Sequence, residues 1–152
     1  MTYTKSQFSI LLILRIVLGY HFLFEGIDKL FNSFWTSAVF LEQTNWFLSD
    51  FYHYLAGGEL SIMIVEQLNI WGQIFIGLSL IIGLFSKIGA YSGALLLLIY
   101  YLAPPPFLEG FLFIDKNLIE MLAFLIIALF PTSNIVGLDL LLSKYRKIRN
   151  EQ

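Results

Sequence analysis

Apolar residues run along this chain in four long stretches, over about residues 8–31, 60–85, 88–103 and 113–130. Each stretch is close to the roughly 20 residues that an α-helix needs to cross the hydrocarbon core of a bilayer, although the third and fourth are short. Pro104 begins a run of three prolines that ends the third stretch, because proline lacks a backbone donor and clashes with the preceding turn. The pattern predicts an all-α integral membrane protein, a four-helix bundle formed by a single domain of residues 1–152.

The composition points the same way. Hydrophobic residues make up 58% of the chain and charged residues 13%, and the mean hydropathy is +0.77, which lies outside the range of ordinary soluble domains. A net charge of −2 offers no basic surface for nucleic acid. The chain has no cysteine, which excludes a disulfide, a thiolate nucleophile and a cysteine-bound metal, and we predict no metal site.

Lysine and arginine positions predict the orientation in the membrane. Lys5, Lys87 and the basic tail at residues 143–152 fall on one side, whereas Lys29 and Lys116 fall on the other. Basic residues collect in cytoplasmic loops, so we expect both termini in the cytoplasm. We also expect the first stretch to remain as a span rather than a signal peptide, because Arg15 interrupts it. The tail either only sets this topology or also contacts anionic headgroups.

The connection between the first two stretches, residues 32–58, is rich in aromatic residues such as Trp35, Trp46 and Tyr52. Aromatic side chains with polar tips favour the headgroup level of a bilayer. We therefore expect a partly helical interfacial segment. It serves either as a lid over a pocket or as an aromatic belt.

Titratable residues inside the predicted spans are the main candidates for chemistry. Glu25, Glu66 and Glu120 each lie about six residues inward from an outer helix end, which is roughly 9 Å at 1.5 Å per residue. A carboxylate inside a bilayer is costly and commonly marks a functional site. His21 precedes Glu25 by one helical turn, so an imidazole–carboxylate contact is available. We take Glu66, Glu25, His21 and Glu120 as candidate catalytic residues that carry protons.

Basic and amide residues accompany these glutamates. Lys29 and Lys116 each lie four residues from one of them. Gly19 and Gly26 flatten the stripe of the first helix that carries Arg15, which allows a neighbouring helix to approach closely. The candidate substrate-binding residues are Lys29, Lys116, Asn117, Gln73 and Arg15. The alternative is an ion-pair network that only fixes how the helices pack.

Several of these motifs resemble those of the DoxX-like family of small membrane proteins (DoxX/DoxD type). The run RIVLGYHFLFEGIDKL is similar to the first-span signature of the family, with Arg15, Gly19, Gly26 and Lys29 at the matching positions. The run WGQIFIGLSLIIGLFSKIGA resembles the second helix, with Lys87 where the family commonly has arginine. The run DKNLIEMLAFLIIALFP resembles the last helix, so the resemblance extends over about residues 8–142.

The resemblance implies a protein of the bacterial cytoplasmic (inner) membrane and a subunit of a quinone-linked oxidoreductase acting on small sulfur or thiol compounds. A membrane quinone is then the expected cofactor, and another membrane or periplasmic protein or a second copy is the expected partner. In this interpretation Lys29 and Lys116 attract a small anion or polarise a quinone carbonyl. A non-enzymatic scaffold or assembly subunit and a small-solute transporter are the alternatives, so the sequence leaves enzymatic activity open.

Overall fold

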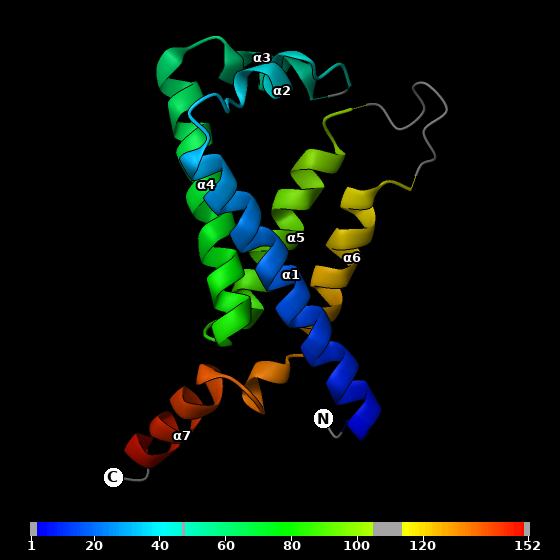
Figure 1. Ribbon diagram of the computed structural model, residues 1–152, viewed down its shortest axis with the longest axis vertical. Helices are drawn as coiled ribbons and strands as arrows, with labels where there is room; N and C mark the ends of the chain where they lie inside the picture. Colours follow the sequence, from blue (N-terminus) through cyan, green and yellow to red (C-terminus); the bar gives the residue numbers. More distant parts are fainter. Residues whose placement is uncertain (1–2, 47, 105–113, 151–152) are drawn as a thin grey trace.

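A computed structural model describes residues 3–46, 48–104 and 114–150, apart from the side chains at 146–148 and 150. Within these residues the fold is entirely helical (Figure 1). The elements are α1 (Lys5–Phe31), α2 (Ala38–Glu42), α3 (Ser49–Ala56), α4 (Glu59–Ile82), α5 (Ser86–Tyr101), α6 (Lys116–Leu129), the short 3-10 helix η1 (Thr132–Asn134) and α7 (Leu138–Asn150). The predicted all-α class is therefore confirmed for the part of the chain that the structure describes.

Among the residues that the structure describes, three stretches of helix are long and apolar enough to cross a membrane: α1, α4, and the run Lys116–Asn134 that joins α6 to η1. Helix α5 has 16 residues, about 24 Å at 1.5 Å per residue, which is less than the roughly 30 Å hydrocarbon core. The predicted ranges of the first three stretches agree with α1, α4 and α5 to within about three residues. The predicted start of the fourth, residue 113, lies outside the described residues.

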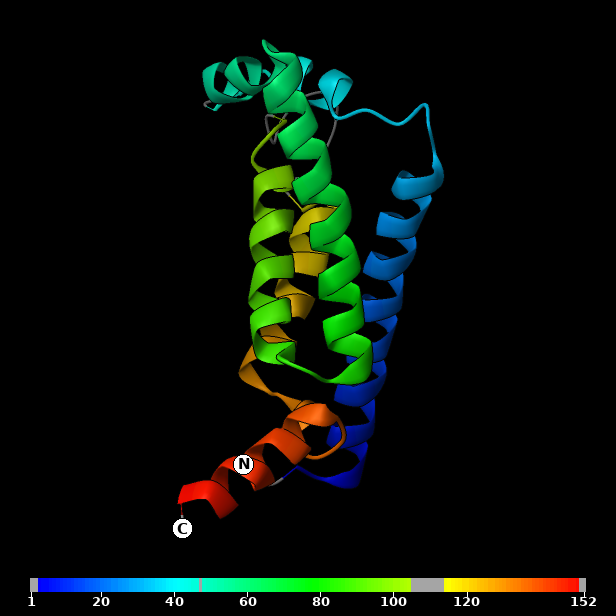
Figure 2. The ribbon, with the colours of Figure 1, turned by 90° about the vertical axis from the view of Figure 1, so that its left-hand side faces the viewer.

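The helices that correspond to the four predicted stretches, α1, α4, α5 and α6, pack side by side. Helix α1 runs along α4, and α5 runs along α6, while contacts of α4 with α5 and of α1 with α6 join the two pairs. Both ends of the chain lie at one end of this group, and α2 and α3 lie across the other end (Figures 1 and 2).

Glycines bring α1 and α4 into backbone contact. A Cβ atom added at Gly77 of α4 would lie 2.5 Å from the backbone nitrogen of Leu23 and 2.7 Å from the carbonyl oxygen of Gly19. One added at Gly26 would lie 3.0 Å from the carbonyl oxygen of Ile70. Small residues at such an interface let two helix backbones approach closely. The predicted role of the glycine stripe on the first helix is confirmed.

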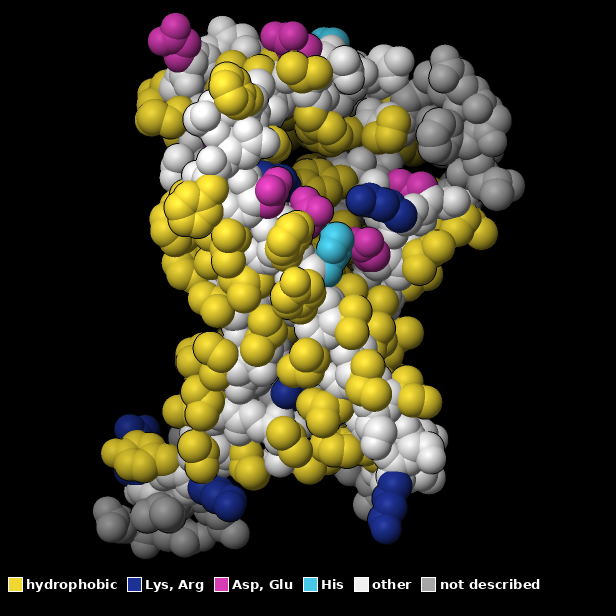
Figure 3. All heavy atoms as spheres, viewed as in Figure 1, with side chains coloured by type: hydrophobic (Ala, Val, Ile, Leu, Met, Phe, Trp, Pro, Cys, Tyr) yellow, Lys and Arg dark blue, Asp and Glu magenta, His cyan; other side chains and the backbone are white. Residues whose placement is uncertain are grey.

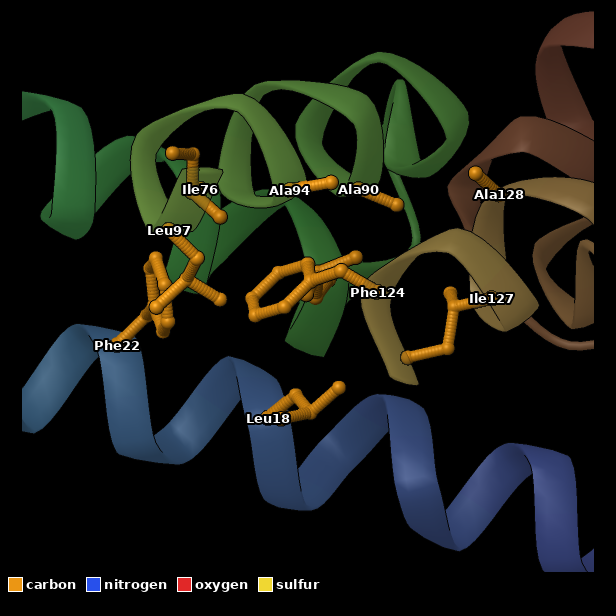
Figure 4. Close-up of a cluster of buried hydrophobic side chains, with 10 residues drawn as sticks. Leu18, Phe22, Ile76, Ala90, Ala94, Leu97, Phe124, Ile127 and Ala128 are labelled. Atoms are coloured by element: carbon orange, nitrogen blue, oxygen red, sulfur yellow. The ribbon is translucent and has the colours of Figure 1, made fainter. Parts of the chain in front are cut away.

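The apolar core lies where all four helices meet, around the ring of Phe124 (Figure 4). Phe22 of α1 meets this ring edge to face, with 4.5 Å between the ring centroids, a favoured aromatic geometry. On the other side the ring packs against Gly93 of α5, where an added Cβ would lie 2.3 Å from a ring carbon. Phe22, Leu80 and Phe124 are fully buried, so this cluster fixes how α5 and α6 sit against α1 and α4.

Large apolar side chains cover much of the outer surface (Figure 3). Ile13 and Phe24 on α1, Phe75 on α4, Leu95 on α5 and Ile119 on α6 are each more than half exposed. Contiguous exposed apolar surface on this scale is rare on soluble monomers. This surface suits contact with lipid chains.

The beginning of α7 closes the turn between α4 and α5. Gly83 ends α4 in the left-handed region, with φ of 71°, a conformation that glycine adopts without steric cost. The backbone N–H of Asp139 donates to the carbonyl oxygen of Gly83 at 2.8 Å. In return the Asp139 carboxylate accepts from the backbone N–H groups of Phe85 and Ser86 at 2.8 and 3.2 Å. Asp139 therefore satisfies the first free donors of α5 from a distant part of the chain.

The predicted interfacial segment, residues 32–58, carries the two short helices α2 and α3. Its partly helical character is confirmed in the part that the structure describes. Tyr52 of α3 is buried, and its hydroxyl donates to the carbonyl oxygen of Ile99 on α5 at 2.8 Å. Burial raises the pKa of the Tyr52 phenol above its ordinary value, so this side chain is a neutral hydrogen-bond donor at physiological pH.

Candidate functional site

A cavity of about 550 Å³ lies beneath the 32–58 segment, at the ends of the four packed helices. We call it the lysine cavity, since Lys29 and Lys116 both line it. Its other lining residues are Trp35, Thr36, Ser37, Phe40, Leu41, Phe51, Tyr52, Leu55, Val65, Leu68, Asn69, Leu96, Ile99, Tyr100, Pro104 and Asn117. Its size falls within the range of ligand pockets, and a mostly apolar wall with a few polar groups is typical of small-molecule sites.

Lys29 is the most constrained charged group of the cavity. Its Nζ donates to Asn69 Oδ1 at 3.0 Å and to Gln73 Oε1 at 2.8 Å, both on α4. An ammonium has three donors, so two are occupied by these amides and one remains for another acceptor. Asn69 and Gln73 are one helical turn apart and both buried, which places their oxygens on one face of α4. The packing of α1 against α4 therefore fixes Lys29 at the cavity wall.

Aromatic rings surround the same ammonium. Lys29 Nζ lies 5.3 Å from the ring centroid of Trp35 and 6.0 Å from that of Tyr100, within the range of cation–π attraction. The Asn69 amide donates to the Tyr100 hydroxyl, which ties α4 to α5 at this level. Phe40 of α2 packs edge to face against Tyr100 at 5.7 Å. The cavity thus combines one accessible cation with flat apolar walls.

Lys116 and Asn117 approach the cavity from the beginning of α6. Asp115 caps this helix by accepting from the backbone N–H of Leu118 at 2.8 Å, and it also accepts from the Asn117 amide at 2.8 Å. Lys116 is near enough to Lys29 for the two charges to repel each other. Two cations that face one cavity favour a ligand that carries negative charge or electron-rich oxygen atoms.

The three predicted glutamates do not converge on the cavity. Glu66 accepts from the Thr36 hydroxyl at 2.7 Å and from the backbone N–H of Ser37 at 3.0 Å. It therefore anchors the 32–58 segment to α4, and it is absent from the cavity lining in the described residues. Glu25 attracts Lys29 electrostatically but does not reach ion-pair distance from it in the described part of the chain.

His21 pairs with a different glutamate from the one that its spacing suggested. Its Nε2 lies 3.7 Å from Glu120 Oε1 on α6, and both side chains are partly exposed. The expected contact with Glu25 one turn away is not an ion pair in the described residues, nor is the one between Lys116 and Glu120. Figure 3 shows acidic, basic and histidine side chains gathered at one level on this face of the molecule. His21 and Glu120 themselves are absent from the cavity lining in the described residues.

Arg15 does not belong to the same site as Lys29. The two residues are fourteen positions apart on α1, or roughly 21 Å along the helix axis. Arg15 is 2% exposed and donates through Nη1 to the Thr132 hydroxyl at 3.1 Å, near η1 at the opposite end of the molecule. Its Nε has no hydrogen-bond partner among the described residues. The shared stripe on α1 therefore serves packing at both ends rather than one binding site.

Sequence reasoning left out several residues that form the cavity. Asn69 supplies one of the two acceptors for Lys29, and its spacing of four residues from Gln73 is the signal that could have identified it. Trp35 and Tyr100 supply the cation–π contacts. Their approach to Lys29 depends on how the 32–58 segment and α5 fold over α1, and the sequence pattern does not encode that approach.

Comparison with known proteins places the chain in a family. The DoxX family model matches residues 10–103, which include Lys29, Trp35, Asn69 and Tyr100 of the cavity. Comparisons with curated proteins and with solved structures gave no match. The family model covers more than half of the 152 residues, and the helices are apolar enough to span a membrane. The chain is therefore a membrane protein that belongs to the DoxX family.

Proposed function

We propose that the protein is a subunit of a quinone-linked oxidoreductase that acts on small sulfur or thiol compounds, and that the lysine cavity holds the quinone ring. In this proposal α5 serves as a short fourth span, so that α1, α4, α5 and α6 form a four-helix bundle in a bacterial cytoplasmic membrane. Both termini then lie in the cytoplasm, as the basic residues favour. The observation that carries the proposal is the Lys29 ammonium beside aromatic walls, held by two amides and with a third donor that has no acceptor among the described residues.

The residues present fit a quinone. A quinone has a flat ring, two carbonyl acceptors and an apolar tail, and the cavity offers aromatic surfaces together with two lysines. Lys29 supports a carbonyl oxygen with its free N–H, because its other two are fixed by Asn69 and Gln73. Lys116 adds positive charge on the α6 side. Such preorganised donors stabilise negative charge that develops on an oxygen atom.

The bound quinone would supply the acceptor of two electrons and two protons. The chain has no cysteine, so it has no dithiol, and the electrons come from the sulfur substrate or a partner subunit. Tyr100 and Trp35, which both line the cavity, would hold the ring in place through their aromatic surfaces. The proton route that we propose passes through His21 and Glu120 on the neighbouring face, where the two side chains are 3.7 Å apart, with Glu25 near Lys29.

Quinone binding can be measured in lipid nanodiscs by quenching of Trp35 fluorescence, in a Trp46→Phe/Trp71→Phe background. We expect Lys29→Met to weaken binding by about 10- to 150-fold, since a hydrogen bond to a charged group contributes roughly 1.5–3 kcal/mol. Lys87→Met is the matched control, because Lys87 is an exposed lysine at the other end of the bundle. Equal quenching in Lys29→Met and the control would contradict the site.

The oxidoreductase role needs a separate measurement. We expect quinone reduction when thiosulfate or a small thiol is added to the protein extracted in mild detergent with its bound partners. A protein that binds quinone yet reduces none under these conditions would keep the site and overturn the activity. Neither binding nor reduction, with a stoichiometric protein partner retained, would favour the scaffold alternative.

A further inference from the structure

Helix α7 presents an apolar face that the described residues leave uncovered. Leu138, Leu141 and Tyr145 are 40%, 59% and 66% exposed, and their spacings of three, four and seven residues put them on one side of the helix. Ser143 lies on the opposite side at 100° per residue. An exposed apolar stripe needs an apolar environment to bury it.

Positive charge is concentrated on the same helix. Four of the nine basic residues of the chain, Lys144, Arg146, Lys147 and Arg149, fall within α7. The only acidic residue of the helix is Asp139, and its carboxylate already accepts from the N–H groups at the beginning of α5. The sequence of α7 is therefore cationic as well as amphipathic.

The attachment of α7 places it at the level where the membrane surface would be. The hydrogen bond from Asp139 to the Gly83 carbonyl fixes its beginning beside the end of α4, a helix long and apolar enough to cross a bilayer. From there α7 runs obliquely to the side, away from the packed helices, in both views (Figures 1 and 2). Lys5 and Lys87 are at the same end of the molecule.

We propose that α7 lies on the membrane surface and binds anionic phospholipid headgroups. Its basic side chains contact the headgroups while Leu138, Leu141 and Tyr145 enter the boundary with the acyl chains. Amphipathic helices with basic flanks bind anionic bilayers in this way, through buried apolar area and electrostatic attraction together. Lysine favours such a position because its long stem stays in the apolar layer while its ammonium reaches the phosphates. The proposal is independent of quinone binding in the lysine cavity.

Single spin labels provide the test, since the chain has no cysteine to remove. Leu141→Cys, Tyr145→Cys and Ser143→Cys are each labelled in the full chain, in bilayers of phosphatidylcholine alone or mixed in equal parts with phosphatidylglycerol. With the anionic lipid we expect labels at 141 and 145 to be relaxed by oxygen and shielded from a water-soluble relaxant. The label at 143 stays accessible to water. In bilayers of phosphatidylcholine alone, we expect the labels at all three positions to be accessible to water.

Charge variants identify the source of the attraction. Lys144→Gln/Arg149→Gln should lower the ratio of membrane-bound to free α7 roughly 30-fold in the anionic bilayer, given the attraction of each basic residue near such a surface. Lys5→Gln/Lys87→Gln removes the same charge elsewhere at this end and should leave the ratio unchanged. Water accessibility at all three positions in both bilayers would overturn the proposal. So would shielding of 141 and 145 that is independent of lipid, because that result indicates a protein partner.

Discussion

Gly77 and Gly72 lie on the same helix, and alanine at each should have opposite effects on stability. A Cβ at Gly77 would lie 2.5 Å from the Leu23 nitrogen, and one at Gly72 would meet nothing within 4 Å. Ordinary contacts of this kind are 3.4 to 4 Å long, so Gly77→Ala forces α1 and α4 apart by about 1 Å at this point. The atoms in the way belong to backbone and cannot rotate aside.

The magnitude follows from two opposing terms. Replacing glycine by alanine inside a helix stabilises it by about 1 kcal/mol at either position. Overpacking lowers stability by about 1–3 kcal/mol, and only Gly77→Ala incurs this cost. We therefore expect Gly77→Ala to be less stable than Gly72→Ala by about 1–3 kcal/mol, toward the upper end because the contacts are rigid.

The free energies of unfolding can be compared in mixed micelles by titrating a denaturing detergent and following tryptophan fluorescence. The two variants have identical composition, so their difference reports position alone. Equal stability, or a Gly77→Ala variant more stable than Gly72→Ala, would refute the close contact between α1 and α4. The geometry that holds Lys29 against Asn69 and Gln73 would then lose its support.

Two further predictions concern the 32–58 segment. Glu66→Ala removes the carboxylate to which the N–H of the buried Ser37 donates, so amide exchange of α2 should accelerate by about 5- to 150-fold. Glu66→Gln keeps an acceptor oxygen and serves as the control. Equal exchange rates in the two variants would contradict the role of Glu66 in attaching the 32–58 segment to α4. For Tyr52, burial raises the pKa above the ordinary 10.0, so the stability that its neutral phenol contributes is complete below that value and is lost as pH rises through the raised pKa. Alkaline loosening of α3, followed by amide exchange, should therefore appear above pH 10 and be weaker in Tyr52→Phe, and a profile identical in both proteins would exclude the phenol as its cause.

Hydropathy and glycine spacing sufficed for the helices and for one of their contacts. The predicted boundaries of the first spans agree with α1 and α4, and Gly19 and Gly26 do form the surface that meets α4. These features are local, since they depend on the period of one helix. Contacts with residues on other helices cannot be read from the period of one helix. The sequence places His21 one turn from Glu25, but the pairing of His21 with Glu120 depends on the register of α1 against α6.

Contacts between elements that are distant in the sequence also decide which residues form the lysine cavity. Lys29 and Gln73 were both candidate substrate-binding residues, and the structure joins them. Glu66 was a candidate catalytic residue because its expected depth in the membrane matched that of Glu25 and Glu120. It instead accepts from Thr36 in the connecting segment, a contact that no helical periodicity encodes. Arg15 shares the α1 stripe with Lys29, yet a stripe that runs the length of a helix reaches environments at both of its ends.

The cap that Asp139 provides to α5 has a consequence for assembly. The residues that it joins, Asp139 and Phe85, are 54 positions apart. Both α5 and α6 lie between them in the chain, and α6 belongs to a stretch apolar enough to cross the membrane. In the four-span arrangement that we propose, the beginning of α5 therefore keeps free N–H groups during synthesis until α6 has been inserted and the chain has returned to the side where Asp139 can reach it. The cap can close only when insertion is complete, so an inverted or missing last span would leave the N–H groups at the beginning of α5 without the Asp139 carboxylate as acceptor.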